Sequence, residues 1–110
     1  MANTFKNAAL ANVNHSAYST LYTAPSSTTT VVLGLAIANK TTSAVDVQVQ
    51  FSDSSGGTTH QLLENVSIPS NTTLETLAGQ KYILETGDAL KVQSGTASAL
   101  DVVLGIMEIT

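Results

Sequence analysis

Two histidines, His15 and His60, are the side chains of this sequence best suited to proton transfer near neutral pH. Twelve serines could serve as nucleophiles, but no Gly-x-Ser-x-Gly sequence is present to expose and activate one of them. His60 alternates with Thr59 and Gln61 in an expected strand, which favours a solvent-facing or interfacial side chain over a catalytic one. We therefore expect a protein that is not an enzyme and has no catalytic residue.

Metal and cofactor ligands are equally dispersed. The chain has no cysteine, and its two histidines do not form a His-x-His or His-x₃-His pair. The segment 53–57, Asp-Ser-Ser-Gly-Gly, lacks the alternating oxygen ligands of a calcium loop and is better explained as a turn. Gly56 and Gly57 are not followed by Lys-Ser or Lys-Thr, so they do not indicate a phosphate-binding loop. No metal and no cofactor is expected.

Two tyrosines leave one ligand-binding alternative open. Tyr18 and Tyr22 share the parity of one strand, so both rings could face one side and stack on a carbohydrate. The competing and favoured interpretation places each ring at the edge of the core with its hydroxyl group in water. A carbohydrate-binding module therefore stays as the less favoured alternative.

The composition excludes several classes of function. The 110 residues carry a formal net charge of −4, and only 11% of them are charged, against about 25% in typical soluble domains. Four scattered lysines on an acidic chain cannot form the basic face that nucleic acid requires. The longest apolar runs have the length of a strand, so no membrane span is expected. The first residues also lack the cationic and apolar regions of a secretory signal.

Alternating apolar residues predict strands rather than helices. In 44–52, valines at 45, 47 and 49 and Phe51 alternate with polar residues, which is typical of a half-buried strand. In 30–39, the same period places Val31, Leu33, Leu35 and Ile37 on one face and small residues on the other. The loop 39–43 between these two strands is expected to close a hairpin.

Turn signals divide the rest of the chain into further short strands. They include the pair Ala78–Gly79, which interrupts one alternating segment, and Thr86-Gly87-Asp88. Seven or eight strands with a turn about every ten residues, and no helical periodicity, predict a single antiparallel β-sandwich of the jelly-roll or immunoglobulin-like type. The predicted fold class is all-β, with the sandwich over residues 16–110.

The last strand, 99–109, is apolar on both faces. Such a strand lies in the centre of a sheet or against a neighbouring subunit. Its second face carries Val103, Met107 and Ile109, which we take as candidate subunit contacts. Together with the low charge of the whole chain, this face predicts a homo-oligomer of cyclic symmetry.

The first fifteen residues have a different pattern, with isolated apolar residues at Phe5, Leu10 and Val13. Two interpretations are open: a frayed terminus, or an extended N-terminal arm over 1–15 that lies on a neighbouring protein. The arm interpretation makes Phe5, Leu10 and Val13 candidate interface residues.

One long run has a familiar pattern. Residues 68–92, Ile-Pro-Ser-Asn-Thr-Thr-Leu-Glu-Thr-Leu-Ala-Gly-Gln-Lys-Tyr-Ile-Leu-Glu-Thr-Gly-Asp-Ala-Leu-Lys-Val, resemble small structural proteins of tailed bacteriophages, including marine and cyanobacterial phages. Residues 22–33 and the ending Ile-Met-Glu-Ile at 106–109 are similar to the same family. The motif Leu-x-x-Gly-Asp-x-Leu-x-Val also occurs in cupin-like sandwiches, but the histidine cluster of metal-dependent cupins is missing here.

The resemblance implies a non-enzymatic virion component. The first role it implies is that of a capsid decoration (cement) protein, a trimer that clamps neighbouring copies of the major capsid protein. The virion would be assembled in the host cytoplasm. The second role that the resemblance implies is that of a protein of the neck, tail or fibres that joins two rings or meets the host surface. In both cases the partners are virion proteins, and neither nucleic acid nor a membrane is involved.

Overall fold

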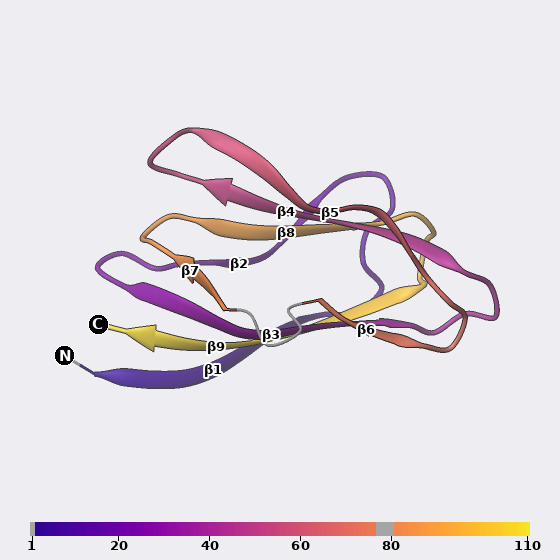
Figure 1. The fold of residues 1–110 in the computed structure, drawn as a ribbon, viewed down its shortest axis with the longest axis horizontal. Helices are drawn as coiled ribbons and strands as arrows, with labels where there is room; N and C mark the ends of the chain where they lie inside the picture. Colours follow the sequence, from indigo (N-terminus) through magenta and orange to yellow (C-terminus); the bar gives the residue numbers. More distant parts are fainter. Residues whose placement is uncertain (1, 77–80) are drawn as a thin grey trace.

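The computed structural model describes residues 2–76 and 81–110 and folds them as two antiparallel sheets packed face to face (Figure 1). The strands are β1 (Asn3–Leu10), β2 (Ser19–Thr23), β3 (Thr29–Asn39), β4 (Val45–Asp53), β5 (Thr58–Ile68), β6 (Thr73–Glu75), β7 (Tyr82–Leu84), β8 (Ala89–Ser94) and β9 (Leu100–Ile109). The all-β sandwich predicted from the sequence is confirmed. The turn expected at Ala78–Gly79 lies outside the described residues.

The strand order is that of a jelly roll. One sheet has the order β1-β9-β3-β6, with β7 also paired to β3, and the other has the order β2-β8-β4-β5. β6 and β7 occupy two stretches of the same edge of β3, opposite Ala36–Ala38 and Thr30–Val32 respectively. Apart from the β4–β5 hairpin and the step from β6 to β7, each pair of consecutive strands lies in different sheets, which gives the wrapped Greek-key pattern of jelly rolls.

The prediction of a hairpin between β3 and β4 is wrong, because these strands lie in different sheets. The loop 39–43 instead crosses from one layer to the other. Asn39 holds it there: its side chain is buried and hydrogen-bonds to backbone atoms of this loop, of Ile68 at the end of β5 and of Pro69 directly after it. A turn motif alone does not distinguish these two connections, since both require only a reversal of the chain.

The core is an apolar layer between the sheets, formed mainly by β3, β4, β8 and β9. In β9, Leu100, Val102, Leu104 and Ile106 are each at most 1% exposed, as the alternation predicted. β3 departs from the prediction because its register shifts between Val32 and Gly34. A β-bulge changes the parity of the strand. Val32 and Leu35 therefore point into the core, while Leu33 is 39% exposed.

Residues 3–10 of the expected arm form β1, the outer strand of the first sheet, paired with β9 along its whole length. Ala2 and Thr110 exchange two backbone hydrogen bonds of 3.1 and 2.9 Å, so the two ends of the chain lie side by side (Figure 1). After β1, the N–H of Val13 donates to the carbonyl of Leu100 at 2.9 Å, and the side chain of Val13 is buried. The segment is thus part of the sandwich and does not extend away from it.

Candidate functional site

A row of apolar side chains crosses the outer surface of the first sheet. Phe5 of β1 lies opposite Met107 of β9, Met107 lies opposite Val31 of β3, and Val31 lies opposite Ile83 of β7. Phe5 is 73% exposed and Ile83 53%, while the two central members are half-buried by their neighbours. The pairing register alone therefore builds a continuous band, which we call the apolar row, across four strands that are separate in the sequence.

Further hydrophobic side chains widen this band into a face. The four large hydrophobic residues that are exposed in the described part of the chain, Phe5, Leu33, Ile83 and Val103, all belong to strands of this sheet. Together with Val31, Met107 and Ile109 they form what we call the apolar face. Gly34 and Gly105 pair across its middle, and a Cβ atom on either glycine would meet nothing within 4 Å. The pair leaves a shallow depression in the face.

The outer surface of the second sheet has the opposite character. It presents mainly amide side chains, which hydrogen-bond to one another and to Tyr18. The hydroxyl of Tyr18 donates to Oε1 of Gln48 at 2.5 Å and accepts from Nε2 of Gln61 at 3.1 Å, and Nε2 of Gln48 donates to Asn65 at 2.7 Å. Because these polar groups are satisfied within the chain or by water, this surface gains little from a partner. The apolar face is the surface with hydrophobic area to bury.

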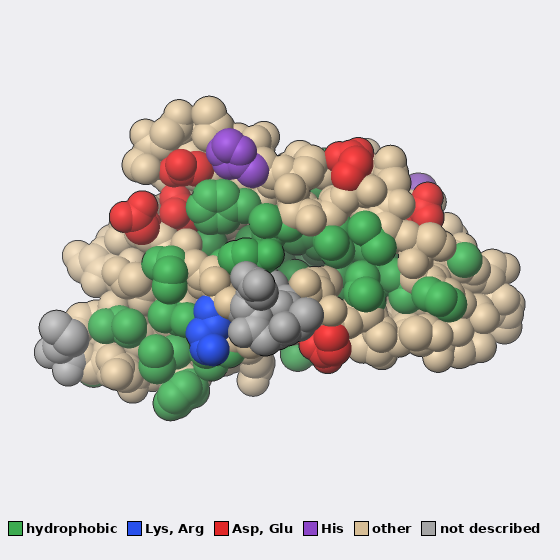
Figure 2. Space-filling view, viewed as in Figure 1, with side chains coloured by type: hydrophobic (Ala, Val, Ile, Leu, Met, Phe, Trp, Pro, Cys, Tyr) green, Lys and Arg blue, Asp and Glu red, His purple; other side chains and the backbone are tan. Residues whose placement is uncertain are grey.

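The apolar surface continues around the edge of the sandwich. Figure 2 shows hydrophobic side chains gathered along the side of the molecule where the edges of the two sheets face the viewer. A groove of about 240 Å³ opens there, lined by Phe51, Leu62, Tyr82 and Ile83. Ile83 belongs to both this groove and the apolar row, so the two apolar surfaces are continuous.

The structure brings some of the predicted interface residues together and separates others. Val103, Met107 and Ile109 lie on the apolar face, and Phe5 joins them there through its pairing with Met107. Leu10 lies opposite Val102 and packs against the core, and Val13 is only 2% exposed. Leu10 and Val13 therefore stabilise the sandwich itself, and the expectation that they anchor an arm on a neighbour does not fit this packing. Val31 and Ile83 are not among the predicted interface residues. The bulge in β3 and the short length of β7 interrupt the alternation of faces on which that prediction depends.

Tyr18 and Tyr22 do not form the shared platform that stacking on a carbohydrate would require. The register of β2 shifts between Thr20 and Tyr22, so the equal parity of the two tyrosines is lost. Tyr18 lies on the outer side of the second sheet, while Tyr22 lies opposite buried Leu90 and reaches toward the first sheet. The expectation of one tyrosine face is wrong for this reason.

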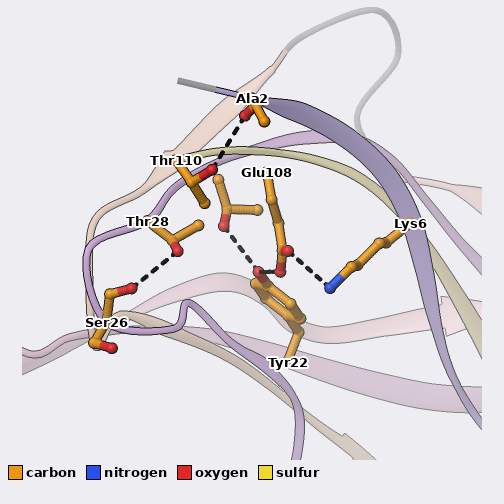
Figure 3. Close-up of polar contacts among 8 residues, drawn as sticks. Ala2, Lys6, Tyr22, Ser26, Thr28, Glu108 and Thr110 are labelled. Carbon is orange, nitrogen blue, oxygen red and sulfur yellow. Dashed lines mark hydrogen bonds and ion pairs between the residues drawn. The ribbon is translucent and has the colours of Figure 1, made fainter.

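Tyr22 instead belongs to a polar cluster that ties the two sheets together at one end of the sandwich (Figure 3). Its hydroxyl donates to Oε2 of Glu108 at 2.5 Å and lies 2.8 Å from Oγ1 of Thr30. Lys6 pairs with the other carboxylate oxygen of Glu108 at 2.9 Å. Four strands, β1, β2, β3 and β9, each contribute one of these side chains. The cluster is a structural clasp rather than a reaction centre, since its groups satisfy one another.

The clasp changes the titration of its members. The hydrogen bond from Tyr22 and then the bond to Lys6 lower the pKa of the Glu108 carboxyl group. A carboxyl group with a lowered pKa in the folded state stabilises the fold above its usual titration range and loses that contribution as the pH falls. Burial, and then the carboxylate of Glu108, raise the pKa of Tyr22 from 10.0 to about 12. The contribution of this neutral phenol is present below pH 10 and is lost as the pH rises toward 12.

Replacing Tyr22 with phenylalanine is therefore expected to change the alkaline stability of the protein. The wild-type free energy of unfolding should fall between pH 10 and 12, because the unfolded chain releases the phenolic proton before the folded chain does. The Tyr22→Phe protein lacks that proton, so its unfolding free energy should fall less steeply over the same range. Urea denaturation at several pH values measures this slope. Tyr18→Phe is the matched control and should keep the wild-type slope; equal slopes for all three proteins would contradict the clasp.

The two histidines lie apart at the surface. His60 is exposed on β5, where its ring stacks on Phe51 at 6.4 Å between centroids and its Nε2 lies 3.1 Å from Oγ1 of Thr58. His15 is exposed in the loop before β2. Within residues 2–76 and 81–110, no group of three or more His, Cys, Asp or Glu side chains could hold a metal ion.

In the described part of the chain, no helix has the length and apolar character needed to cross a membrane.

Comparison with solved structures gives the same architecture in other proteins, while no family model and no curated protein matches the sequence. A chain from the acid-stable capsid of Helicobacter pylori bacteriophage KHP30 superposes with a TM-score of 0.57 at 12% identity, covering 100% of this chain and 94% of that one. A chain of the disulfide-linked pili that are Bacillus endospore appendages gives 0.56 at 12% identity, covering 98% and 88%. The VP2 subviral particle of infectious bursal disease virus gives 0.55 at 8% identity, covering 96% of this chain and 32% of that one.

At these identities, the comparisons establish the shared fold. This chain has no cysteine, so it cannot form the disulfide links that the endospore pili are named for.

Proposed function

We propose that this chain is a non-enzymatic structural protein of a virus particle, and specifically a capsid decoration (cement) protein of a tailed bacteriophage. The observation that carries the proposal is the apolar face: one outer surface of a small jelly roll is hydrophobic, while the other is polar and satisfied. A monomeric protein with such a face leaves hydrophobic area in water that assembly would bury. In an assembled shell, a neighbouring protein can cover such an apolar face permanently.

The fold comparisons support this proposal. Two of the three neighbours described above are chains of viral particles, and the phage capsid chain matches over nearly its whole length. The sequence run at 68–92 resembles structural proteins of tailed phages, which points in the same direction. In the proposed role, the protein forms a homo-oligomer, expected to be a trimer, and binds the major capsid protein in particles assembled in the host cytoplasm.

The proposed work of the protein is mechanical. A protein that binds the closed capsid lattice, but not the opened one, stabilises the closed lattice by mass action. Opening the shell then requires more free energy. The apolar face suits that work, because its centre carries no charge: Lys6 and Glu108 point to the other side of the sheet and neutralise each other. Burying this face therefore costs little desolvation of charged groups.

The copy number of the chain in purified particles tests the location. Quantitative mass spectrometry should give a ratio to the major capsid protein near one, or one set by the threefold positions of the lattice. A ratio far below this would place the chain in the neck, tail or fibres, which is the alternative location, and would overturn the decoration role. Absence from particles would overturn the virion proposal.

A matched pair of variants tests the surface. Met107→Lys places a charge at the centre of the apolar face, and we expect it to weaken binding to particles by at least about tenfold, or about 1.4 kcal/mol. Gln61→Lys adds the same charge to the exposed surface of the other sheet and should bind like the wild type. Circular dichroism of both variants verifies that they are folded. Equal binding by the two variants would contradict the proposed docking surface.

A further inference from the structure

The outer edge of β1 is open. β1 is the last strand of its sheet, and the backbone bonds exchanged by Ala2 and Thr110 fix which of its residues face β9. In an antiparallel pair of strands, residues whose N–H and C=O groups face the partner strand alternate with residues whose groups point away from it. The N–H and C=O groups of Asn3, Phe5, Asn7 and Ala9 therefore point away from β9, and these four residues are exposed. In the described part of the chain, no hydrogen bond to these outward backbone groups is observed.

The other sheet edges are protected against pairing in ways that β1 is not. β5 pairs with β4 through two register shifts, and Asn65 within it has a positive φ of 51°. β2 is five residues long and contains a bulge, and β6 and β7 have three residues each. Short, bulged or twisted strands resist edge-to-edge association. β1 has eight residues in unbroken register with β9, so it is the regular edge that another strand can extend.

We propose that β1 pairs antiparallel with β1 of a second copy of this chain, with Phe5 opposite Phe5 of that copy. An antiparallel pair of identical strands is twofold symmetric, so each copy supplies both the donors and the acceptors that the other needs. The one charged residue of β1, Lys6, forms an ion pair with Glu108, so the edge as a whole carries little net charge, and repulsion arises only where two Lys6 side chains stand directly opposite each other. The second copy is therefore a partner with the right chemistry for this edge.

The register follows from the side chains. A pairing centred on Lys6 would set two ammonium groups against each other, which is unfavourable for directly opposed residues. Centring the pair on Phe5 places Lys6 opposite Thr4 and brings two aromatic rings together across the junction. The apolar row of one copy then continues into that of the next, from Ile83 of one molecule to Ile83 of the other. Pairing would thus join two apolar faces into one, while leaving both available to a further partner.

This inference concerns the isolated protein and does not depend on the proposed role in a particle. Native mass spectrometry and light scattering of the purified chain should give an even-numbered assembly: about twice the 11.4 kDa of one chain if this contact forms alone, or two joined trimers if the threefold contact of the proposed trimer forms as well. A single trimer would overturn the pairing of β1 strands. Phe5→Lys and Phe5→Glu should each halve that mass, because each places like charges at the twofold axis. An equal mixture of the two variants should restore the wild-type mass. A wild-type protein that stays monomeric at millimolar concentration, or a mixture that does not associate, would overturn the proposal.

A backbone variant separates strand pairing from packing of the phenyl rings. Asn7→Pro removes an N–H that points to the open edge, so it should halve the mass and leave the β1–β9 pairing intact. Asn7→Ala keeps the N–H and should assemble like the wild type. Circular dichroism checks that both are folded. If Asn7→Pro is folded and assembles as the wild type does, the strands do not pair through this edge.

Discussion

Replacing Asn39 with alanine is expected to lower the free energy of unfolding by about 3 kcal/mol. The Asn39 side chain is 3% exposed, and its Nδ2 donates to the carbonyl groups of Ser43 and Ile68, both at 2.9 Å, and approaches that of Pro69 at 3.2 Å. Its Oδ1 accepts from the N–H and the hydroxyl of Thr41 at 2.9 and 2.7 Å. Alanine removes all of these hydrogen bonds, including the buried one to the carbonyl of Ile68, and a buried polar group left unsatisfied costs about 1 to 3 kcal/mol.

Thermal and urea denaturation measure this effect, and 3 kcal/mol corresponds to a fall in Tm of about 15 °C for a domain of this size. Asn7→Ala is the matched control, because Asn7 is exposed on β1, and it should change stability by less than about 0.5 kcal/mol. Asn39→Asp keeps the acceptor but sets a carboxylate against carbonyl oxygens, so it should be at least as damaging as alanine at neutral pH. A loss below about 1 kcal/mol for Asn39→Ala would show that the crossing loop is held by other contacts.

Replacing Asp88 with alanine is expected to have a similar effect, about 3 kcal/mol. Asp88 is 2% exposed, and its two carboxylate oxygens each accept one backbone hydrogen bond. Oδ1 accepts from the N–H of Ser54 at 2.9 Å, in the β4–β5 turn, and Oδ2 accepts from the N–H of Glu85 at 3.0 Å, before β8. Hydrogen bonds to charged groups are worth about 1.5 to 3 kcal/mol each, so the loss of two partners is costly.

The isosteric variant Asp88→Asn tests whether both bonds matter. An amide has one oxygen that accepts and one nitrogen that does not, so it can keep only one of the two bonds, and we expect about half of the loss seen with alanine. Asp46→Ala, at an exposed position of β4, should have little effect. Chemical denaturation of the four proteins gives the ranking. If Asp88→Asn lowers the free energy of unfolding as much as Asp88→Ala does, the contribution of Asp88 does not divide between its two oxygens as proposed.

Neither of these buried polar residues was identified from the sequence. Asn39 stands at the start of a loop that was expected to close a hairpin, and Asp88 in a tight turn beside Gly87. Asn and Asp are common in turns whatever lies around them, so the pattern indicates the turn and not the second segment that the side chain contacts. In both cases the side chain also binds a segment about thirty residues away in the chain. Long-range contacts of this kind leave no local signal.

The structure places the predicted interface residues in two different surroundings. Val103, Met107 and Ile109 share one parity of β9, and their placement on the outer face follows directly from the period of two. Val13 stands among polar neighbours in the sequence, which suggests an arm, yet it is 2% exposed and its N–H donates to the carbonyl of Leu100, a residue distant in sequence. Whether the apolar face binds another protein stays a prediction.

The sequence by itself determined the class of the fold, the positions of most strands and the low charge of the surface. These properties depend on composition and on the alternation of neighbouring residues, which a single strand already contains. Only the tertiary structure decided which strands share a sheet, where the bulges in β2 and β3 reverse the parity, and that β1 closes the sheet instead of leaving it. The apolar row itself depends on the register between strands that are up to about a hundred residues apart. That register is set by the packing of the whole core, since a slip of one residue would expose every buried side chain of a strand.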